Sequence, residues 1–132
     1  MHGLAIIAVV AAIIGLVVAV GLASWISKAD EGNDRMKEIA GFIREGAMAF
    51  LAREYKTMVI VVVVLFLIIG FALQSWTTAV LYLCGAALSV LAGFFGMKVA
   101  TLGNVRTANA ARESGMNKAL KIAFRSGAVM GL

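Results

Sequence analysis

The chain has 132 residues, of which 62% are hydrophobic and 14% are charged, and it contains no proline. A typical soluble domain has about 45–50% apolar and about 25% charged residues. A soluble domain this small could not cover so much apolar surface, so the composition excludes an ordinary water-soluble fold and predicts helices in a bilayer.

The first hydrophobic block runs from Leu4 to Ile26 without a charged residue. At about 1.5 Å per residue, a helix of this length crosses a hydrocarbon core of about 30 Å. A cleaved signal peptide is the alternative, with Gly21-Leu22-Ala23 as a small-residue cleavage site. The block is longer than the usual apolar stretch of about 7–15 residues, and no basic residue precedes it, so a span is favoured.

Two further blocks, Thr57–Leu73 and Ala79–Met97, are separated only by Gln74–Thr78. The β-branched run Val59–Val64 is typical of a buried strand in water, but the length of the uncharged block favours a helix in lipid. The short connection predicts a tight helical hairpin, and Trp76 suits the membrane interface.

A fourth segment starts near Asn117 and ends in the apolar run Gly127–Leu132, which is too short to cross a membrane. It is either a re-entrant or interfacial piece or the start of a longer span. The predicted fold class is therefore all-α, a polytopic membrane protein with three complete transmembrane helices and the start of a fourth. We expect one transmembrane helical region over residues 1–132, with spans at about 4–26, 57–73 and 79–97 and a partial one at 117–132.

The twelve Lys and Arg residues fall into two regions and are absent from the N-terminal leader and from the hairpin. The positive-inside rule predicts that regions 27–56 and 98–117 are cytoplasmic and that the N-terminus is outside. The net positive charge of the chain is thus mostly explained by the orientation of its helices in the membrane. We expect no nucleic-acid partner, since no binding motif accompanies the basic residues.

The helices are expected to continue beyond the membrane as cytoplasmic extensions. Asp34 is the predicted N-cap of the extension that precedes the second span, and no proline interrupts the chain between them. The third helix is predicted to continue through Lys98–Arg112 and to stop at Ser114-Gly115, with the glycine as its C-terminal cap.

Small residues at helical spacing predict close packing between helices. They form one stripe in the first span, one in the third with further small residues close beside it, and a GxxxG pair in the fourth: Ala11, Gly15, Ala19 and Ala23; Gly85, Ser89, Gly93 and Met97, beside Ala92, Gly96 and Ala100; Gly127 and Gly131.

No Asp, Glu, Lys, Arg or His lies inside the three complete spans. Such residues mark proton relays and ion paths, so these helices are not expected to carry the path, and a rotor-ring subunit is excluded. Two charged groups are candidates for binding sites. Asp30, Glu31 and Asp34 have the carboxylates that magnesium prefers but fit no calcium loop, and five basic residues could meet an anion: Arg106, Arg112, Lys118, Lys121 and Arg125. A solvated helix start explains the first group and positive-inside topology the second, so no catalytic, cofactor-binding or metal residue is predicted.

Three stretches resemble the membrane-bound, ion-translocating pyrophosphatases, in the family's order and spacing, and together they cover essentially the whole chain. They are Met36–Ile43 followed by Glu45–Lys56, then Gly93–Ala111, then Ala119–Leu132. Gly103 is a small departure, since the family more often has alanine there.

The resemblance implies an all-helical homodimeric pump that hydrolyses magnesium pyrophosphate at the cytoplasmic side and moves H+ or Na+ across the membrane. This chain resembles its first helices, which belong to an outer ring, so its partners would be the lipid bilayer and the remainder of the pump chain. The family's acidic pyrophosphate-binding motif is absent here. Mg²⁺ is therefore implied with ligands outside this chain, a requirement for K+ is left open, and the chain alone is expected to be inactive.

The alternative is a complete small structural or interaction membrane protein that kept the outer helices without the enzyme. A small transporter built from several copies is a third reading, but it would need broken helices or buried polar groups.

Overall fold

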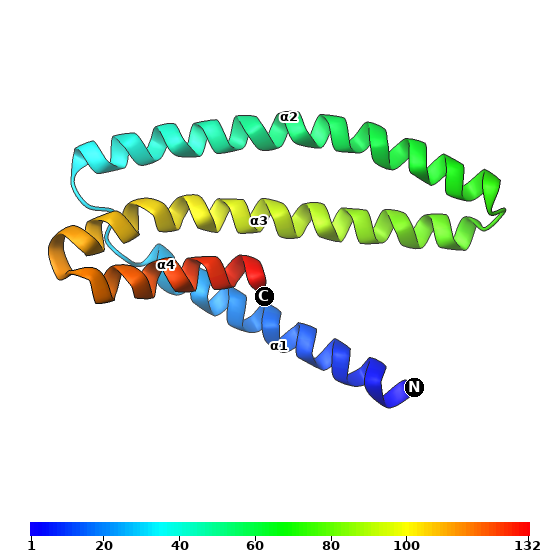
Figure 1. Ribbon diagram of the computed structural model, residues 1–132, viewed down its shortest axis with the longest axis horizontal. Helices are drawn as coiled ribbons and strands as arrows, with labels where there is room; N and C mark the ends of the chain where they lie inside the picture. Colours follow the sequence, from blue (N-terminus) through cyan, green and yellow to red (C-terminus); the bar gives the residue numbers. More distant parts are fainter.

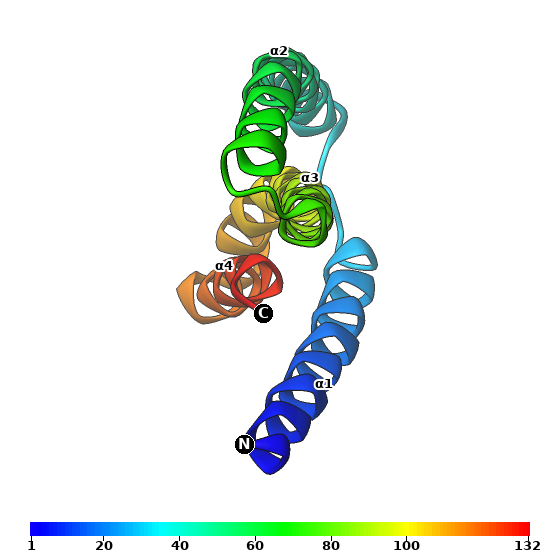
Figure 2. The same cartoon turned by 90° about the vertical axis from the view of Figure 1, so that its right-hand side faces the viewer.

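The computed structural model describes residues 1–132 as four helices without strands: α1 (His2–Ser27), α2 (Asp34–Ala72), α3 (Trp76–Ser114) and α4 (Met116–Gly131). Helices α2 and α3 lie antiparallel along their lengths, and α4 folds back beside α3 (Figure 1). Helix α1 touches α3 and α4 near its C-terminal end and then diverges from them (Figure 2). The predicted all-α fold is confirmed.

Three of the helices, α1, α2 and α3, are long and apolar enough to cross a membrane, and their most apolar windows are almost wholly exposed. Both α2 and α3 have 39 residues. At about 1.5 Å per residue each is roughly 58 Å long, nearly twice the thickness of a hydrocarbon core. The predicted spans and their extensions thus form continuous helices.

The N-cap of α2 lies one residue before the position predicted from the sequence. The N-cap is Asn33 rather than Asp34: its side-chain oxygen accepts a hydrogen bond of 2.9 Å from the backbone N–H of Met36. Gly32 precedes it at φ +94°, a backbone conformation open to glycine, and Asn33 itself is extended. Asp34 becomes the first helical residue, where its charge suits the helix dipole.

The hairpin between α2 and α3 is shorter than predicted, because the helices leave out only residues 73–75. The Ser75 side chain caps α3 by accepting from the N–H of Thr78. The ring of Trp76 lies so close to Gly70 that a Cβ there would come within 2.6 Å of it. Trp76, predicted as an interfacial residue, therefore also closes the hairpin by packing on the glycine.

At the other end, α3 stops where the sequence predicted. Gly115 is its C-cap and has φ +86°, which favours glycine. The chain reverses there and α4 starts at Met116, one residue from the predicted position. Helix α4 buries Ala119, Ile122 and Ser126 toward its neighbours.

The closest approach between helices is that of α3 and α4, and it depends on glycines of α3. A Cβ on Gly96 would meet the Cγ of Met130 at 2.7 Å, and one on Gly103 would meet the Cβ of Ser126 at 2.8 Å. The Ser126 hydroxyl donates to the carbonyl of Val99 over 3.4 Å. Gly103, the one noted departure from the family pattern, has no side chain, and Ser126 occupies the space that a side chain there would fill.

Part of the predicted packing pattern is wrong for these four helices. A Cβ added to Gly127, Gly131 or Gly85 would meet no atom of another part of the chain within 4 Å. Gly127 and Gly131 do not pack against the other helices, because Ile122 and Ser126 define the face that α4 turns toward them. Residue 127 follows Ser126 by one position, about 100° around the helix.

Helices α2 and α3 are joined by one hydrogen bond, at the start of the predicted second span. The Tyr55 hydroxyl donates to the carbonyl of Val90 over 3.1 Å. Gly93, one turn further along α3, leaves space beside this hydroxyl, since a Cβ there would lie 3.9 Å from it.

Candidate functional site

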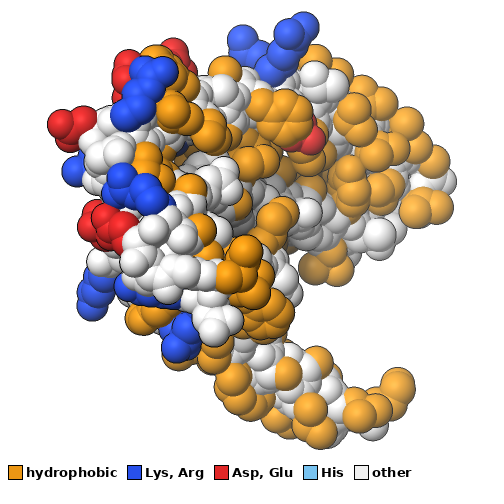
Figure 3. All heavy atoms as spheres, turned by 60° about the vertical axis from the view of Figure 1, so that its left-hand side comes forward, with side chains coloured by type: hydrophobic (Ala, Val, Ile, Leu, Met, Phe, Trp, Pro, Cys, Tyr) orange, Lys and Arg blue, Asp and Glu red, His pale blue; other side chains and the backbone are white.

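The charged side chains gather mainly at the end of the molecule where the α1–α2 loop and the α3–α4 turn meet. Figure 3 shows acidic and basic groups over this end and hydrophobic side chains over the rest, including the projecting part of α1. Five residues here, which we call the polar cluster, are connected by hydrogen bonds and ion pairs: Asp30, Glu31, Arg44, Arg106 and Asn109.

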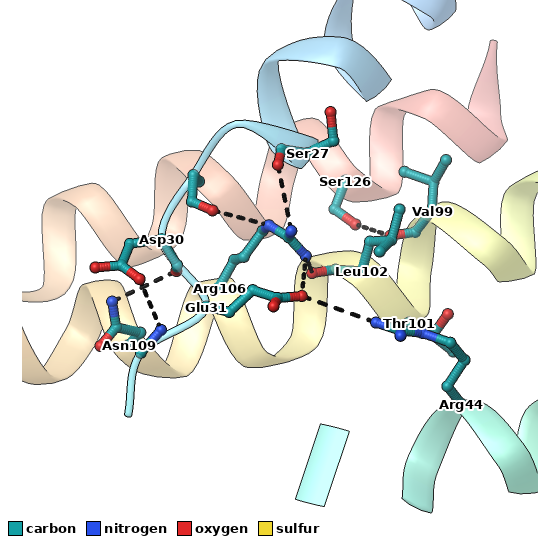
Figure 4. Close-up of polar contacts among 12 residues, drawn as sticks. Ser27, Asp30, Glu31, Arg44, Val99, Thr101, Leu102, Arg106, Asn109 and Ser126 are labelled. Carbon is teal, nitrogen blue, oxygen red and sulfur yellow. Dashed lines mark hydrogen bonds and ion pairs between the residues drawn. The ribbon is translucent and has the colours of Figure 1, made fainter. Parts of the chain in front are cut away.

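Arg106 is the centre of the polar cluster. It projects from α3 and is 6% exposed (Figure 4). Its Nε donates to the carbonyl of Ala29 over 3.0 Å, and its Nη2 donates to that of Ser27 over 3.2 Å. Its Nη1 donates to its own helix, at the carbonyl of Leu102.

These contacts place a cation at the C-terminal end of α1. The last carbonyls of a helix have no partner within it, and the helix dipole makes this end partially negative. The Arg106 guanidinium supplies both the missing donors and a compensating charge to α1, which ends at Ser27. Helix α3 thereby fixes where α1 ends.

The same guanidinium binds the loop that follows. Its Nη1 lies 3.2 Å from a carboxylate oxygen of Glu31, and Arg44 of α2 approaches that oxygen to 3.9 Å. Glu31 therefore bridges α3 and α2 through two arginines. A carboxylate between two cations is held by Coulomb attraction from both sides, which fixes the loop between α1 and α2.

Asn109, one turn after Arg106 and 3% exposed, completes the polar cluster. Its amide donates to the backbone carbonyl of Asp30 over 3.4 Å, and its side-chain oxygen accepts from Arg112 over 3.0 Å. The Asp30 carboxylate accepts from the N–H of Gly32. No buried side-chain nitrogen or oxygen in the structure lacks a partner.

A small cavity of about 80 Å³ lies beside the polar cluster and is lined in part by Arg106, Asn109 and Lys118. Ligand pockets typically measure about 300–1,000 Å³. Both sides of the cavity carry groups already engaged with the protein, so the arrangement joins helices and presents no reactive pair of nucleophile and base.

The acidic residues considered as magnesium ligands do not converge. Glu31 faces Arg106 and Arg44, Asp30 bonds to Gly32, and Asp34 begins α2. The structure contains no group of three or more His, Cys, Asp or Glu side chains that could hold a metal ion. The residues present therefore do not fit the Mg²⁺ that the family resemblance implies.

The basic residues considered for an anion are also separated. Arg106 is buried in the polar cluster, Arg112 pairs with Glu113 at 2.9 Å, and Lys118 bonds to Ser114. Arg125 lies over the ring of Trp25, 4.1 Å from its centroid. Only Lys121 has no such contact, so the five side chains do not share one site.

The sequence interpretation missed the role of Arg106 because it grouped this residue with the topology signal. One pattern was available: Val99, Gly103, Arg106 and Ala110 recur at three- and four-residue steps, which places the arginine on the buried face of α3. A charge on such a face needs partners, and carbonyls at a helix end provide them.

The sequence is similar to known proteins over nearly its whole length. Residues 13–132 match the family model described as inorganic H+ pyrophosphatase. A relative from Clostridium tetani, provisionally named a K(+)-stimulated pyrophosphate-energized sodium pump, is 51% identical over 136 residues, covering 100% of this chain and 19% of its own length. A K(+)-insensitive pyrophosphate-energized proton pump of Methanosarcina mazei is 47% identical, covering 100% and 20%. A K(+)-stimulated pyrophosphate-energized sodium pump of Thermotoga maritima is 47% identical over 103 residues, covering 77% and 14%. The chain thus spans about a fifth of the length of the first curated relatives it matches.

Proposed function

The chain belongs to the inorganic H+ pyrophosphatase family, and we propose that it forms the N-terminal outer helices of a pump that couples hydrolysis of magnesium pyrophosphate to translocation of H+ or Na+. It is an integral membrane protein of helical type. The observation that carries the proposal is the match over residues 13–132, together with relatives whose names state pyrophosphate-driven pumping of protons or sodium.

The role we propose for these helices is structural support of the pump. The complete spans contain no Asp, Glu, Lys, Arg or His, and the polar cluster is engaged in holding α1, α2 and α3 together. Ion paths need intramembrane polar groups. The remainder of the pump would therefore carry the pyrophosphate site, the ion path and the ligands of Mg²⁺, and it would decide any dependence on K+.

For the orientation, we propose that the polar cluster faces the cytoplasm and that the N-terminus and residues 73–75 lie outside. The basic residues at the polar cluster's end support this through the positive-inside rule. In a Cys84→Ala background, Lys37→Cys and Ser75→Cys should be labelled from opposite sides of sealed vesicles by a membrane-impermeant thiol reagent. Labelling of Lys37→Cys from the outside of intact cells would reverse the orientation.

The activity is tested on the protein purified from its own membrane and reconstituted into vesicles. We expect Mg²⁺-dependent hydrolysis of pyrophosphate, coupled to movement of H+ or Na+ into the lumen. The matched control is the 1–132 chain alone, for which no hydrolysis is expected because its acidic side chains form no cluster that could hold a metal ion. Intact native protein without pyrophosphatase activity would contradict the proposed function.

A measurement of the native mass accompanies this test. A mass several times 13.8 kDa per chain would support the rest of the pump as the partner of these helices, and assembly into pairs would support a homodimer. A mass near 13.8 kDa would favour the small structural protein instead.

A further inference from the structure

A groove of about 360 Å³ lies where α1, α3 and α4 diverge. Its walls are apolar and come from all three helices, with Ala19 on α1, Ala92 on α3 and Val129 on α4 among them. It lies within the apolar part of α1 and α3, both of which are long enough to span a membrane. An apolar groove at this depth is accessible to lipid chains rather than to water.

Toward the polar end of the molecule, α1 and α4 carry an aromatic and basic group beside this groove. The Arg125 guanidinium lies 4.1 Å from the centre of the Trp25 ring. Trp25 follows the groove residue Ala23 by two positions and does not line the groove, whereas Arg125 lies one helical turn before the groove residue Val129 on α4. Tryptophan and arginine both favour the level of lipid headgroups, where one part of the side chain is apolar and the other is solvated.

Two lysines add charge at the same level. Lys28 is the C-cap of α1, one turn beyond Trp25, and Lys121 lies one turn before Arg125 on α4. Helices α1 and α4 run antiparallel here, since Gly15 approaches Leu132 while Trp25 meets Arg125. Both lysines therefore lie beyond the Trp25–Arg125 contact, on the side away from the groove.

These cations have no acidic partner. The structure contains four ion pairs, formed by Arg35, Arg44, Arg106 and Arg112, and none involves Lys28, Lys121 or Arg125. The carboxylate of Glu31 in the nearby loop is already held by Arg106 and Arg44. Within these four helices, the junction of α1 and α4 thus presents three cations without an ion-pair partner at the polar end of an apolar groove.

We propose that this groove binds an anionic phospholipid, with an acyl chain along α1, α3 and α4 and the phosphate against Arg125, Lys121 and Lys28. The apolar walls match the acyl chain, and the unpaired cations match the headgroup charge. Each Lys or Arg near an anionic membrane surface contributes about 1 kcal/mol, so each should favour an anionic over a zwitterionic lipid by about fivefold. One lipid would lie between α1, which diverges, and the packed helices α3 and α4.

The headgroup is tested with the protein purified from its own membrane in mild detergent. It is incubated with equal amounts of phosphatidylglycerol and phosphatidylcholine of identical acyl chains, and retained lipids are counted by native mass spectrometry. Preferential retention of one phosphatidylglycerol is expected. Equal retention of the two lipids, or of neither, would overturn the proposal.

The matched variants locate the charge. Arg125→Gln with Lys121→Gln should remove the preference, whereas Arg35→Gln with Lys37→Gln, the same charge change at the exposed start of α2, should leave it unchanged. Arg125→Lys keeps the charge and should keep the preference, which separates headgroup binding from loss of the Trp25 contact. A preference that survives the first double substitution would place the lipid elsewhere.

The acyl chain is tested by filling the groove. Ala92 and Ala87 are both exposed on α3, but Ala92 lines this groove and Ala87 faces a different one beside α2. Ala92→Leu should lower retention severalfold for phosphatidylglycerol, and Ala87→Leu should not. If Ala92→Leu leaves retention intact, or if a protein helix rather than lipid is found cross-linked along Ala92, the groove is not the lipid site.

Discussion

Different kinds of contact stabilise the two ends of this molecule. At one end, most of the 17 buried residues lie between Val99 and Ser126, and Arg106 and Asn109 bind the carbonyls of the α1–α2 loop. At the other end, α1 from His2 to Ile14 has no buried residue, and α2 and α3 meet through apolar surfaces and the Trp76 contact.

The difference follows from the solvent of each end. In lipid, an apolar side chain loses nothing by remaining exposed, and a helix already satisfies its own backbone groups. Association there depends on close packing and on a few hydrogen bonds. Outside the bilayer, helix ends and loop carbonyls need donors, so the specific contacts that position α1, α2 and α3 are concentrated where the chain leaves the membrane.

The largest effect should come from Arg106→Leu, which removes the central residue of the polar cluster. It leaves the carbonyls of Ser27 and Ala29 without their donors and Glu31 without its nearer cation. We expect the unfolding free energy, measured by denaturant titration in micelles, to fall by about 3 kcal/mol.

The control for this substitution is Arg112→Leu. Arg112 is 47% exposed; it pairs with the exposed Glu113 and donates one hydrogen bond to the side-chain oxygen of Asn109, so its loss should lower stability by about 1 kcal/mol or less. Arg106→Lys should recover only part of the loss, because one ammonium cannot reach three carbonyls in the guanidinium's planar geometry. Equal losses for Arg106→Leu and Arg112→Leu would refute the role given to Arg106.

Gly103→Ala tests the close approach of α3 and α4. The new Cβ would lie 2.8 Å from the Cβ of Ser126, so the helices must move apart, at a cost of about 1–3 kcal/mol. Gly85→Ala, where no atom lies within 4 Å, should be neutral or slightly stabilising.

The same steric reasoning predicts a specific rescue. Combining Gly103→Ala with Ser126→Gly should restore stability beyond the sum of the two single changes, since the conflicting Cβ is removed. Strictly additive losses would show that the two positions do not contact each other.

Asn33→Ala tests the start of α2 and should cost about 1 kcal/mol, because the N–H of Met36 loses its acceptor. Asp34→Ala, at the position first predicted as the cap, should cost only about 0.3–1 kcal/mol through the helix dipole. The reverse order of the two losses would contradict the observed cap.

The smallest effect concerns the pairing of α2 with α3. Tyr55→Phe removes the hydrogen bond to Val90, and such bonds between membrane helices average about 0.6 kcal/mol. Tyr82→Phe is the control, since no hydrogen bond involves its hydroxyl in the structure. A loss for Tyr55→Phe as large as that for Arg106→Leu would remove the contrast between the two ends.

The sequence by itself determined the helices. Uncharged blocks, the absence of proline, and Gly115 between two helical patterns gave the spans, their extensions and the turn before α4. These features act within a few residues or through the average hydrophobicity of a segment, so they can be read without knowing the partners of each helix.

Only the tertiary structure decided which helix faces meet. Gly96 and Gly103 pack closely whereas Gly85, Gly127 and Gly131 do not, although all five are small residues on helices. Arg106 differs from Arg112 in the same way: both are arginines near the end of α3, yet only one reaches the carbonyls of α1 and the loop after it. The rotation and separation of neighbouring helices fix these contacts, because a side chain's partners across 70 or more residues depend on where two helices cross rather than on its local sequence.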